Sequence, residues 1–210
     1  MEDLPHKNFK CNVQSERRME NMISHVIWDL GETLTTPPNS RMDVKPLTEY
    51  PEIELREHVL EVLETINNMG LKHAILSNTA TSDSDVVREL LKRLHILDKF
   101  EYVYATKSEL DPSIPEKPDS IVYHQVLEKL DIQPEEAVMI GNTWDTDVIG
   151  ANRIGMHSIW LQNLEISVRK DFDEKVVTPP WILPVWDIAE VPKAIELIIG
   201  CSQNEDRAEP

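Results

Sequence analysis

Four polar side chains that could act on an anionic substrate follow apolar, strand-like runs of the sequence. Asp29 follows the run His25–Trp28, Ser77 ends a second run, and Asn142 and Asp147 follow a third. In open α/β folds the carboxyl ends of parallel strands meet at one edge of the sheet, and ligands bind there. We therefore expect these four side chains to lie close together.

Lys117, which lies in Glu-Lys-Pro at the start of a predicted helix, would add an ammonium group to the same edge. A carboxylate nucleophile, a hydroxyl, an ammonium and a carboxylate and amide cluster suit attack on a phosphate. Asp29 would attack phosphorus, Ser77 and Lys117 would hold the phosphoryl oxygens, and a hard cation would screen the charge. These residue types favour chemistry on a small phosphorylated molecule.

Strand-like and helix-like segments alternate along the chain. The expected strands are 25–28, 72–77, 101–106, 136–142 and 157–161, and the expected helices are 54–69, 84–94, 119–130, 147–154 and 191–199. This alternation predicts an α/β fold, a Rossmann-like three-layer sandwich with helices on both faces of a central parallel sheet. Residues 178–188 are expected to form an irregular strand at the edge of the core, with a dimer contact or a substrate lid as the alternative.

The composition limits the partners of this chain. Its 210 residues carry a formal net charge of −17. Nucleic acid is therefore an unfavourable partner, because phosphate backbones are bound by clustered Lys and Arg. No apolar run approaches the ~18 residues that a membrane span needs. The two cysteines, Cys11 and Cys201, match no metal or redox spacing, so we expect a cytoplasmic protein.

Polar segments flank the predicted domain. Residues 1–22 lack the apolar region of a secretory signal and are expected to be an N-terminal extension. Residues 201–210 form a polar acidic tail with nothing to bury, which we expect to be mobile. A single domain is then expected over residues 23–200.

Four segments resemble the motifs of the haloacid dehalogenase (HAD) superfamily, whose members are mostly magnesium-dependent phosphatases. Trp28-Asp-Leu-Gly-Glu-Thr-Leu34 is similar to the first motif, with Asp29 at the nucleophile position, and Leu76-Ser-Asn78 is similar to the second. Glu116-Lys-Pro118 is similar to the third motif and Gly141-Asn-Thr-Trp-Asp-Thr-Asp-Val-Ile-Gly-Ala151 to the fourth. The resemblance implies a HAD-like fold, an aspartyl-phosphate on Asp29, phosphate binding by Ser77, Asn78 and Lys117, and Mg²⁺ bound by Asp29, Gly31, Asn142 and Asp147.

Two positions depart from the family pattern. Gly31 stands where family phosphatases usually carry the aspartate that protonates the leaving oxygen. General acid–base catalysis is worth about 10² to 10⁴ in rate, so its loss should be felt unless Glu32, the nearest candidate, replaces it. Asn142 stands where the family usually has a magnesium-binding aspartate. An amide oxygen can bind a hard cation but brings no charge, so the affinity for metal should fall.

The short intervals between the motifs leave no room for a large cap domain. Capless members of the superfamily have open sites, so the loop 35–53 is the expected substrate-selecting element. Arg41 and Lys45 could contact a substrate anion there, and the alternative is that they are solvated loop charges. The histidines show no zinc-binding spacing, and His25, His73 and His157 are expected to be packing or surface residues.

Three functions remain open at this point. The first choice is a Mg²⁺-dependent phosphomonoesterase that acts through Asp29. A metal-free 2-haloacid dehalogenase-like hydrolase is the second, because such a site would tolerate the loss of carboxylates at positions 31 and 142. The third is a weakly active or non-catalytic phosphate-ligand-binding protein. A homodimer is one option for the oligomeric state.

Overall fold

A single parallel sheet forms the centre of the molecule. The computed structural model describes residues 23–37, 45–107, 111, 113–162 and 180–205. Six strands lie in the order β3-β2-β1-β4-β5-β6, and every neighbouring pair is parallel. Their bounds are β1 His25–Trp28, β2 Lys72–Ser77, β3 Phe100–Ala105, β4 Ala137–Gly141, β5 His157–Leu161 and β6 Ile182–Val185.

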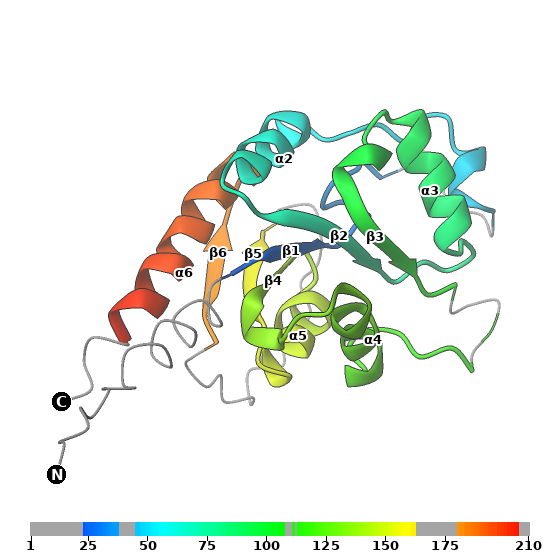
Figure 1. Ribbon diagram of the computed structural model, residues 1–210. Coiled ribbons are helices and arrows are strands. Elements are labelled where there is room, and N and C mark those ends of the chain that lie inside the picture. The colour runs from blue at the N-terminus through cyan, green and yellow to red at the C-terminus, as the bar shows by residue number, and fades with distance from the viewer. Residues whose placement is uncertain (1–22, 38–44, 108–110, 112, 163–179, 206–210) are drawn as a thin grey trace, which may run out of the picture.

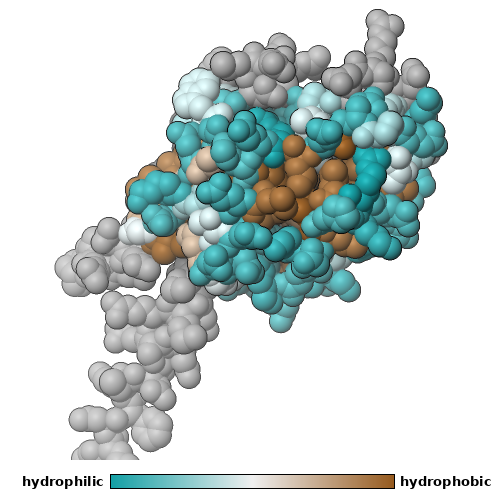
Figure 2. Space-filling model, turned by 90° about the horizontal axis from the view of Figure 1, so that it is seen from above, coloured by the Kyte–Doolittle hydropathy of each residue, from teal (hydrophilic) through white to brown (hydrophobic). Residues whose placement is uncertain are grey.

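Helices cover both faces of this sheet (Figure 1). One face packs against α2 Val59–Asn68, α3 Ser84–Arg93 and α6 Val191–Glu205. The other packs against α4 Ser120–Leu130 and α5 Gly150–Arg153. The predicted three-layer α/β sandwich is thus confirmed. On the face that α2 and α3 cover, hydrophobic residues gather in the middle, within a hydrophilic surround (Figure 2).

Strand β1 occupies the middle of the sheet, and all four of its residues are buried. Val26 and Trp28 pack into the core beneath α2 and α3, whereas Ile27 packs into the core beneath α4. A strand buried on both faces needs such a continuous apolar run. The run ends at Asp29, whose backbone N–H donates to the carbonyl of Ile140 at 2.8 Å, so the carboxylate emerges at the carboxyl edge of the sheet.

The predicted start of the helix 54–69 is wrong by five residues, because α2 begins at Val59. Leu55 instead pairs with Thr35 in an antiparallel bridge, and the N–H of Arg56 donates to the carbonyl of Leu34 at 3.0 Å. His58 then turns the chain with φ 67°. A pairing between segments so far apart in sequence takes precedence over local helical periodicity, and residues 54–58 join the loop beside β1.

Two other helix boundaries also differ from the prediction. The helix expected from Asp147 begins earlier, as a π-helical turn over Trp144–Ile149 that continues into α5. The last helix runs beyond residue 199 to Glu205, so residues 201–205 continue α6 and do not begin the tail. The expected extension 1–22 and residues 206–210 lie outside the described residues.

The remaining expectations concern the periphery. Strand β6 closes one edge of the sheet, as expected for residues 178–188, of which 178 and 179 lie outside the described part. Among the described residues between β1 and α2, the regular structure is one short 3₁₀ helix, Leu47–Glu49, and no cap domain is present there. Within the described ranges, no helix has both the length and the apolar character needed to cross a bilayer.

Candidate active site

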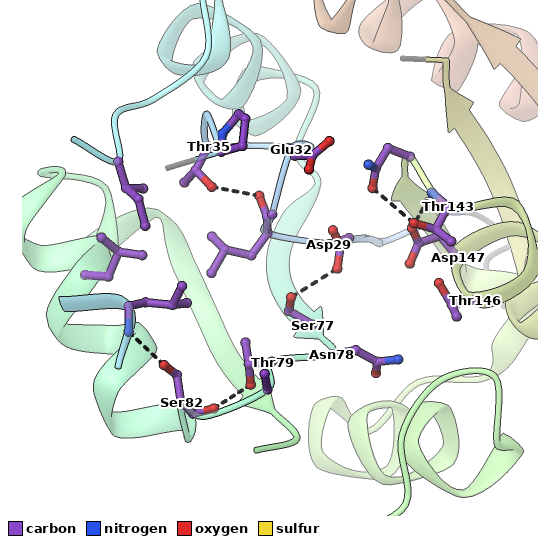
Figure 3. A pocket seen from close by; sticks show the side chains of 18 of the residues that line it. Asp29, Glu32, Thr35, Ser77, Asn78, Thr79, Ser82, Thr143, Thr146 and Asp147 are labelled. Carbon is purple, nitrogen blue, oxygen red and sulfur yellow. Dashed lines mark hydrogen bonds between the residues drawn. The ribbon is translucent and has the colours of Figure 1, made fainter. Parts of the chain in front are cut away.

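Asp29 lies at the centre of a cluster of side chains from three strand ends (Figure 3). Its Oδ1 accepts hydrogen bonds from the Ser77 hydroxyl at 3.1 Å and from the Lys117 ammonium at 2.9 Å. Its Oδ2 accepts one from the Thr33 hydroxyl at 3.3 Å. The side chain is almost buried, with Asp29 only 8% exposed. The structure therefore brings together Asp29, Ser77 and Lys117, which were predicted to meet here.

Lys117 is 2% exposed, and each of its three ammonium protons has an acceptor. They are Asp29 Oδ1 at 2.9 Å, Asp147 Oδ1 at 2.6 Å and the carbonyl of Leu76 at 2.9 Å. Burial by itself lowers the pKa of Lys117, but the two carboxylates outweigh that effect and raise the pKa above its ordinary value. Lys117 is therefore a charged group that connects β1 with the loop after β4.

Asp147 serves as the second counter-ion of Lys117. Its Oδ2 accepts the backbone N–H of Thr143 at 2.9 Å, and the residue is 1% exposed. Burial raises the pKa of Asp147 to about 6. The nearby negative charge of Asp29 adds to this rise, and the ammonium of Lys117 opposes it. A Cβ at Gly141 would overlap the carboxyl group, so the strand end must be glycine. Both oxygens of Asp147 are bound by protein groups, and its predicted role as a metal ligand stays a prediction.

Asn78 holds the Lys117 segment in place. Its side-chain N–H₂ donates to the carbonyl of Lys117 at 2.7 Å, and its Oδ1 accepts the Lys117 N–H at 2.9 Å. The Asn78 side chain thus makes the two hydrogen bonds that a neighbouring strand would make, and it fixes the backbone of Lys117 although that loop is not part of the sheet. The structure uses the oxygen and one of the two amide protons of Asn78 to position Lys117. Asn78 also lines the cavity, and its predicted phosphate binding stays a prediction.

The oxygens that could hold Mg²⁺ converge beside Thr33. Asp29 Oδ2 and Asn142 Oδ1 each lie 3.3 Å from its hydroxyl, which has a single proton to donate. Gly31 lines the same cavity and has a main-chain carbonyl. Carboxylate, amide and carbonyl oxygens are the ligands that Mg²⁺ prefers, so these residues fit the ion. Among the described residues there is no cluster of three or more His, Cys, Asp or Glu side chains that could bind a metal, so such a site would depend on uncharged donors in addition to Asp29.

The positions next to Asp29 differ in what they contribute. Gly31 has open space where a side chain would begin, with no heavy atom within 4 Å of an added Cβ. Glu32 has φ 60°, lines the cavity and lies on the loop above Asp29 (Figure 3). Its main-chain carbonyl accepts the guanidinium of Arg56. The prediction that the Glu32 side chain replaces the acid missing at Gly31 stays a prediction.

The cavity in front of Asp29 has a volume of about 340 Å³ and extends past Asp29, Ser77 and Lys117 to Leu90 of α3. Lys45, one of the two predicted substrate contacts, is exposed and does not line it, and Arg41 lies outside the described residues. The loop 35–53, predicted to select the substrate, does supply part of the cavity wall, through Thr35, Thr36, Pro37, Leu47 and Ile53. Sequence reasoning gave no role to Thr33 or to the part of the wall formed by residues 79–82 and Leu90. The position of Thr33, one helical turn after Asp29, is a signal that could have indicated its contact.

The sequence matches a family model described as haloacid dehalogenase-like hydrolase over residues 5–161. The match includes residues 5–22, which we expected to precede the domain. Among curated proteins, the chain is 28% identical over 127 residues to ribulose-1,5-bisphosphate 5-phosphatase of Halopiger xanaduensis, covering 60% of this chain and 50% of that protein. It is 29% identical over 148 residues to haloacid dehalogenase-like hydrolase domain-containing protein 3 of Xenopus laevis, covering 69% of this chain and 52% of that protein. The chain thus spans about half the length of these relatives.

Two solved structures have a similar fold. An uncharacterized protein from Listeria monocytogenes serotype 4b is 50% identical, with a TM-score of 0.78, and the match covers 83% of this chain and 98% of that one. A haloacid dehalogenase-like family hydrolase from Xanthomonas campestris is 16% identical, with a TM-score of 0.63, and the match covers 88% and 99%. The second likeness concerns the fold alone.

Proposed function

The chain belongs to the haloacid dehalogenase-like hydrolase family, and from this premise we propose that it is a Mg²⁺-dependent phosphomonoesterase that forms an aspartyl-phosphate on Asp29. Relatives named as phosphatases support this choice, among them the glyceraldehyde 3-phosphate phosphatase of Pyrococcus furiosus, 28% identical over 102 residues. Small phosphorylated molecules are accordingly the proposed substrates.

The contacts of Asp29 carry the proposal. Ser77 and Lys117 fix its Oδ1, and the residue lines the cavity. A phosphoryl group that approached from the cavity would reach a carboxylate, a hydroxyl and an ammonium at once. Asp29 supplies the nucleophile. Once its carboxylate is bonded to phosphorus it is a weaker acceptor, so the protons that Ser77 and Lys117 donate to Oδ1 become available to phosphoryl oxygens.

The reaction then proceeds in two steps. A carboxylate oxygen of Asp29 attacks phosphorus, the bond between phosphorus and the ester oxygen breaks, and the leaving oxygen takes a proton from Glu32, if it replaces the missing acid, or otherwise from water. Water next attacks phosphorus, which releases phosphate and restores the carboxylate. When bound by Asp29, Asn142 and the carbonyl of Gly31, Mg²⁺ would supply charge that screens the phosphoryl oxygens.

Hydrolysis of p-nitrophenyl phosphate tests this function. We expect turnover in Mg²⁺, loss of turnover in EDTA, and a fall of at least 10³-fold in Asp29→Asn, because the nucleophile is removed. Asp98→Asn is the matched control, since Asp98 precedes β3 at the opposite edge of the sheet. Full activity of Asp29→Asn would refute the assignment of the nucleophile.

Turnover in ¹⁸O-labelled water separates this proposal from a dehalogenase-like hydrolase. Attack of water on phosphorus places the label in phosphate and leaves Asp29 unlabelled. Hydrolysis of an alkyl ester of Asp29 by attack on its carboxyl carbon would place the label in the side chain. Mass spectrometry of the peptide that contains Asp29 distinguishes the two, and label there after chloride release from 2-chloropropionate would favour the dehalogenase.

A further inference from the structure

The part of the cavity beyond Asp29 has an unusual wall. Five hydroxyl-bearing residues line it, and we refer to them as the hydroxyl wall: Thr35, Thr36, Thr79, Thr81 and Ser82. An ester bound with its phosphorus at Asp29 would direct its leaving group toward this wall. By composition alone, such a wall would suit the hydroxyl groups of a sugar.

The hydrogen bonds of the hydroxyl wall lead to the opposite conclusion. Each of its four threonines donates its only hydroxyl proton to a main-chain carbonyl of the protein. Thr35 donates to Leu30 at 3.2 Å, Thr36 to Glu54 at 3.3 Å, Thr81 to Lys45 at 2.7 Å, and Thr79 to Ser82. The hydroxyl oxygen of Ser82 accepts the N–H of Leu47 at 2.9 Å. The threonines are left with methyl groups and oxygen lone pairs, and they have no proton to offer a ligand.

The rest of this region is apolar. Leu30, Leu47, Ile53 and Leu90 line the same cavity. A leaving group placed among them would bury apolar surface, which is favourable by about 25 cal/mol per Å². A polyol there could donate to the remaining lone pairs, but no threonine proton would replace the donors that its oxygens have in water, which is costly.

The charges of the residues that line the cavity also select against substrates with a second anionic group. Among the described residues that line the cavity, Lys117 is the single Lys or Arg, and the proposed reaction already assigns it to the transferred phosphoryl group. Arg93 does not line the cavity, and its guanidinium donates to the carbonyls of Thr48, Tyr50 and Ile53. Among the described residues, a second phosphate or a carboxylate on the substrate would therefore meet no available cation, and it would be repelled by the carboxylate of Asp29.

We propose that the cavity selects phosphate monoesters whose leaving group is an uncharged, mainly apolar alcohol or phenol. This substrate class differs from the sugar phosphates and bisphosphates named for the relatives, and it rests on the proposed phosphomonoesterase activity. The cavity of about 340 Å³ is near the lower end of ligand pockets, which suits a phosphoryl group with one small ring or branched alkyl chain.

The test compares kcat/KM of benzyl phosphate, glucose 6-phosphate and fructose 1,6-bisphosphate in Mg²⁺. The first two are esters of primary alcohols, so their chemistry is matched. We expect benzyl phosphate to be favoured at least tenfold over glucose 6-phosphate and more strongly over the bisphosphate. Equal or better turnover of either sugar ester would overturn the inference and leave the phosphatase intact. No hydrolysis of any of them or of p-nitrophenyl phosphate would overturn the phosphatase itself, and the inference with it.

Two variants of Thr81 separate its methyl group from its hydroxyl. Thr81→Ser removes the methyl and Thr81→Val removes the hydroxyl. If the wall presents methyl groups, Thr81→Ser should lose about fourfold more kcat/KM for benzyl phosphate than Thr81→Val, the value of one buried methyl group. The control is Thr65→Ser on α2, whose hydroxyl also donates to a carbonyl, that of Glu61, and which does not line the cavity. A larger loss in Thr81→Val, with Thr81→Ser unaffected, would overturn the inference.

Discussion

The open space at Gly31 allows a gain of function to be designed. The family resemblance places a proton donor at this position, and an added Cβ there would meet no heavy atom within 4 Å. The residue does not have the positive φ that would strain a side chain. We therefore expect Gly31→Asp to fold normally and to place a carboxylic acid two residues after the nucleophile.

The expected gain depends on the leaving group. A positioned general acid is worth about 10² to 10⁴ in rate, and a newly inserted one should reach the lower part of this range. For benzyl phosphate, whose alkoxide is a strong base, we expect kcat to rise about 10- to 100-fold. For p-nitrophenyl phosphate, whose leaving group departs without a proton, we expect a change of less than about threefold. The new acid therefore acts only where the departing oxygen needs a proton.

The assay is steady-state hydrolysis of both esters by Gly31→Asp, with Gly31→Asn as the control of equal size that has no acid. A gain for the alkyl ester alone, absent from Gly31→Asn, would establish the missing proton donor. Equal gains for both esters, or the same gain in Gly31→Asn, would refute the reasoning. No gain at all, together with a loss of alkyl ester turnover in Glu32→Gln, would show that Glu32 already supplies the proton.

Three further predictions follow from the burial of charged groups and from the uncharged metal donor. Lys117→Met leaves two buried carboxylates without their counter-ion and should lower the free energy of unfolding by about 3–5 kcal/mol in urea titrations, whereas the exposed Lys193→Met should change it far less. Asn142→Asp adds a charge to the proposed metal donors and should lower the Mg²⁺ concentration for half-maximal activity about tenfold, and an unchanged Mg²⁺ titration would exclude Asn142 as a ligand. Burial lowers the pKa of His157 to about 4, and its Nδ1 accepts the N–H of Trp181 at 2.9 Å. Because the folded pKa lies below the unfolded value of 6.5, stability present at pH 7 should fall by about 3 kcal/mol by pH 4, and urea unfolding of His157→Gln should show that much less pH dependence.

The sequence predicts those parts of the fold that local patterns determine. Strands β1, β2 and β5 agree with the apolar runs, and α3 begins where Asp83 caps it. The early part of the helix predicted from Glu54 fails, because pairing with the segment after Asp29 draws those residues into a loop. No local pattern reports such a pairing.

In the site, too, some features could be predicted from local sequence patterns and others depend on contacts between distant segments. The convergence of Asp29, Ser77 and Lys117 could be predicted, since parallel strands deliver their ends to one edge. The role of Asn78 could not, because it depends on a loop from elsewhere in the chain that lies against its amide. The hydroxyl wall looks polar in the sequence, and only the hydrogen bonds show where its protons are used.

Arg93 of α3 has a consequence for how the enzyme would work. One guanidinium anchors three carbonyls of the segment 48–53, and Ser82 holds Leu47 next to it. This side of the cavity therefore has its shape before any substrate arrives. The cavity should then select its substrate as a preformed site, without a conformational closure on binding. Little conformational entropy of the protein would therefore be lost when the substrate binds.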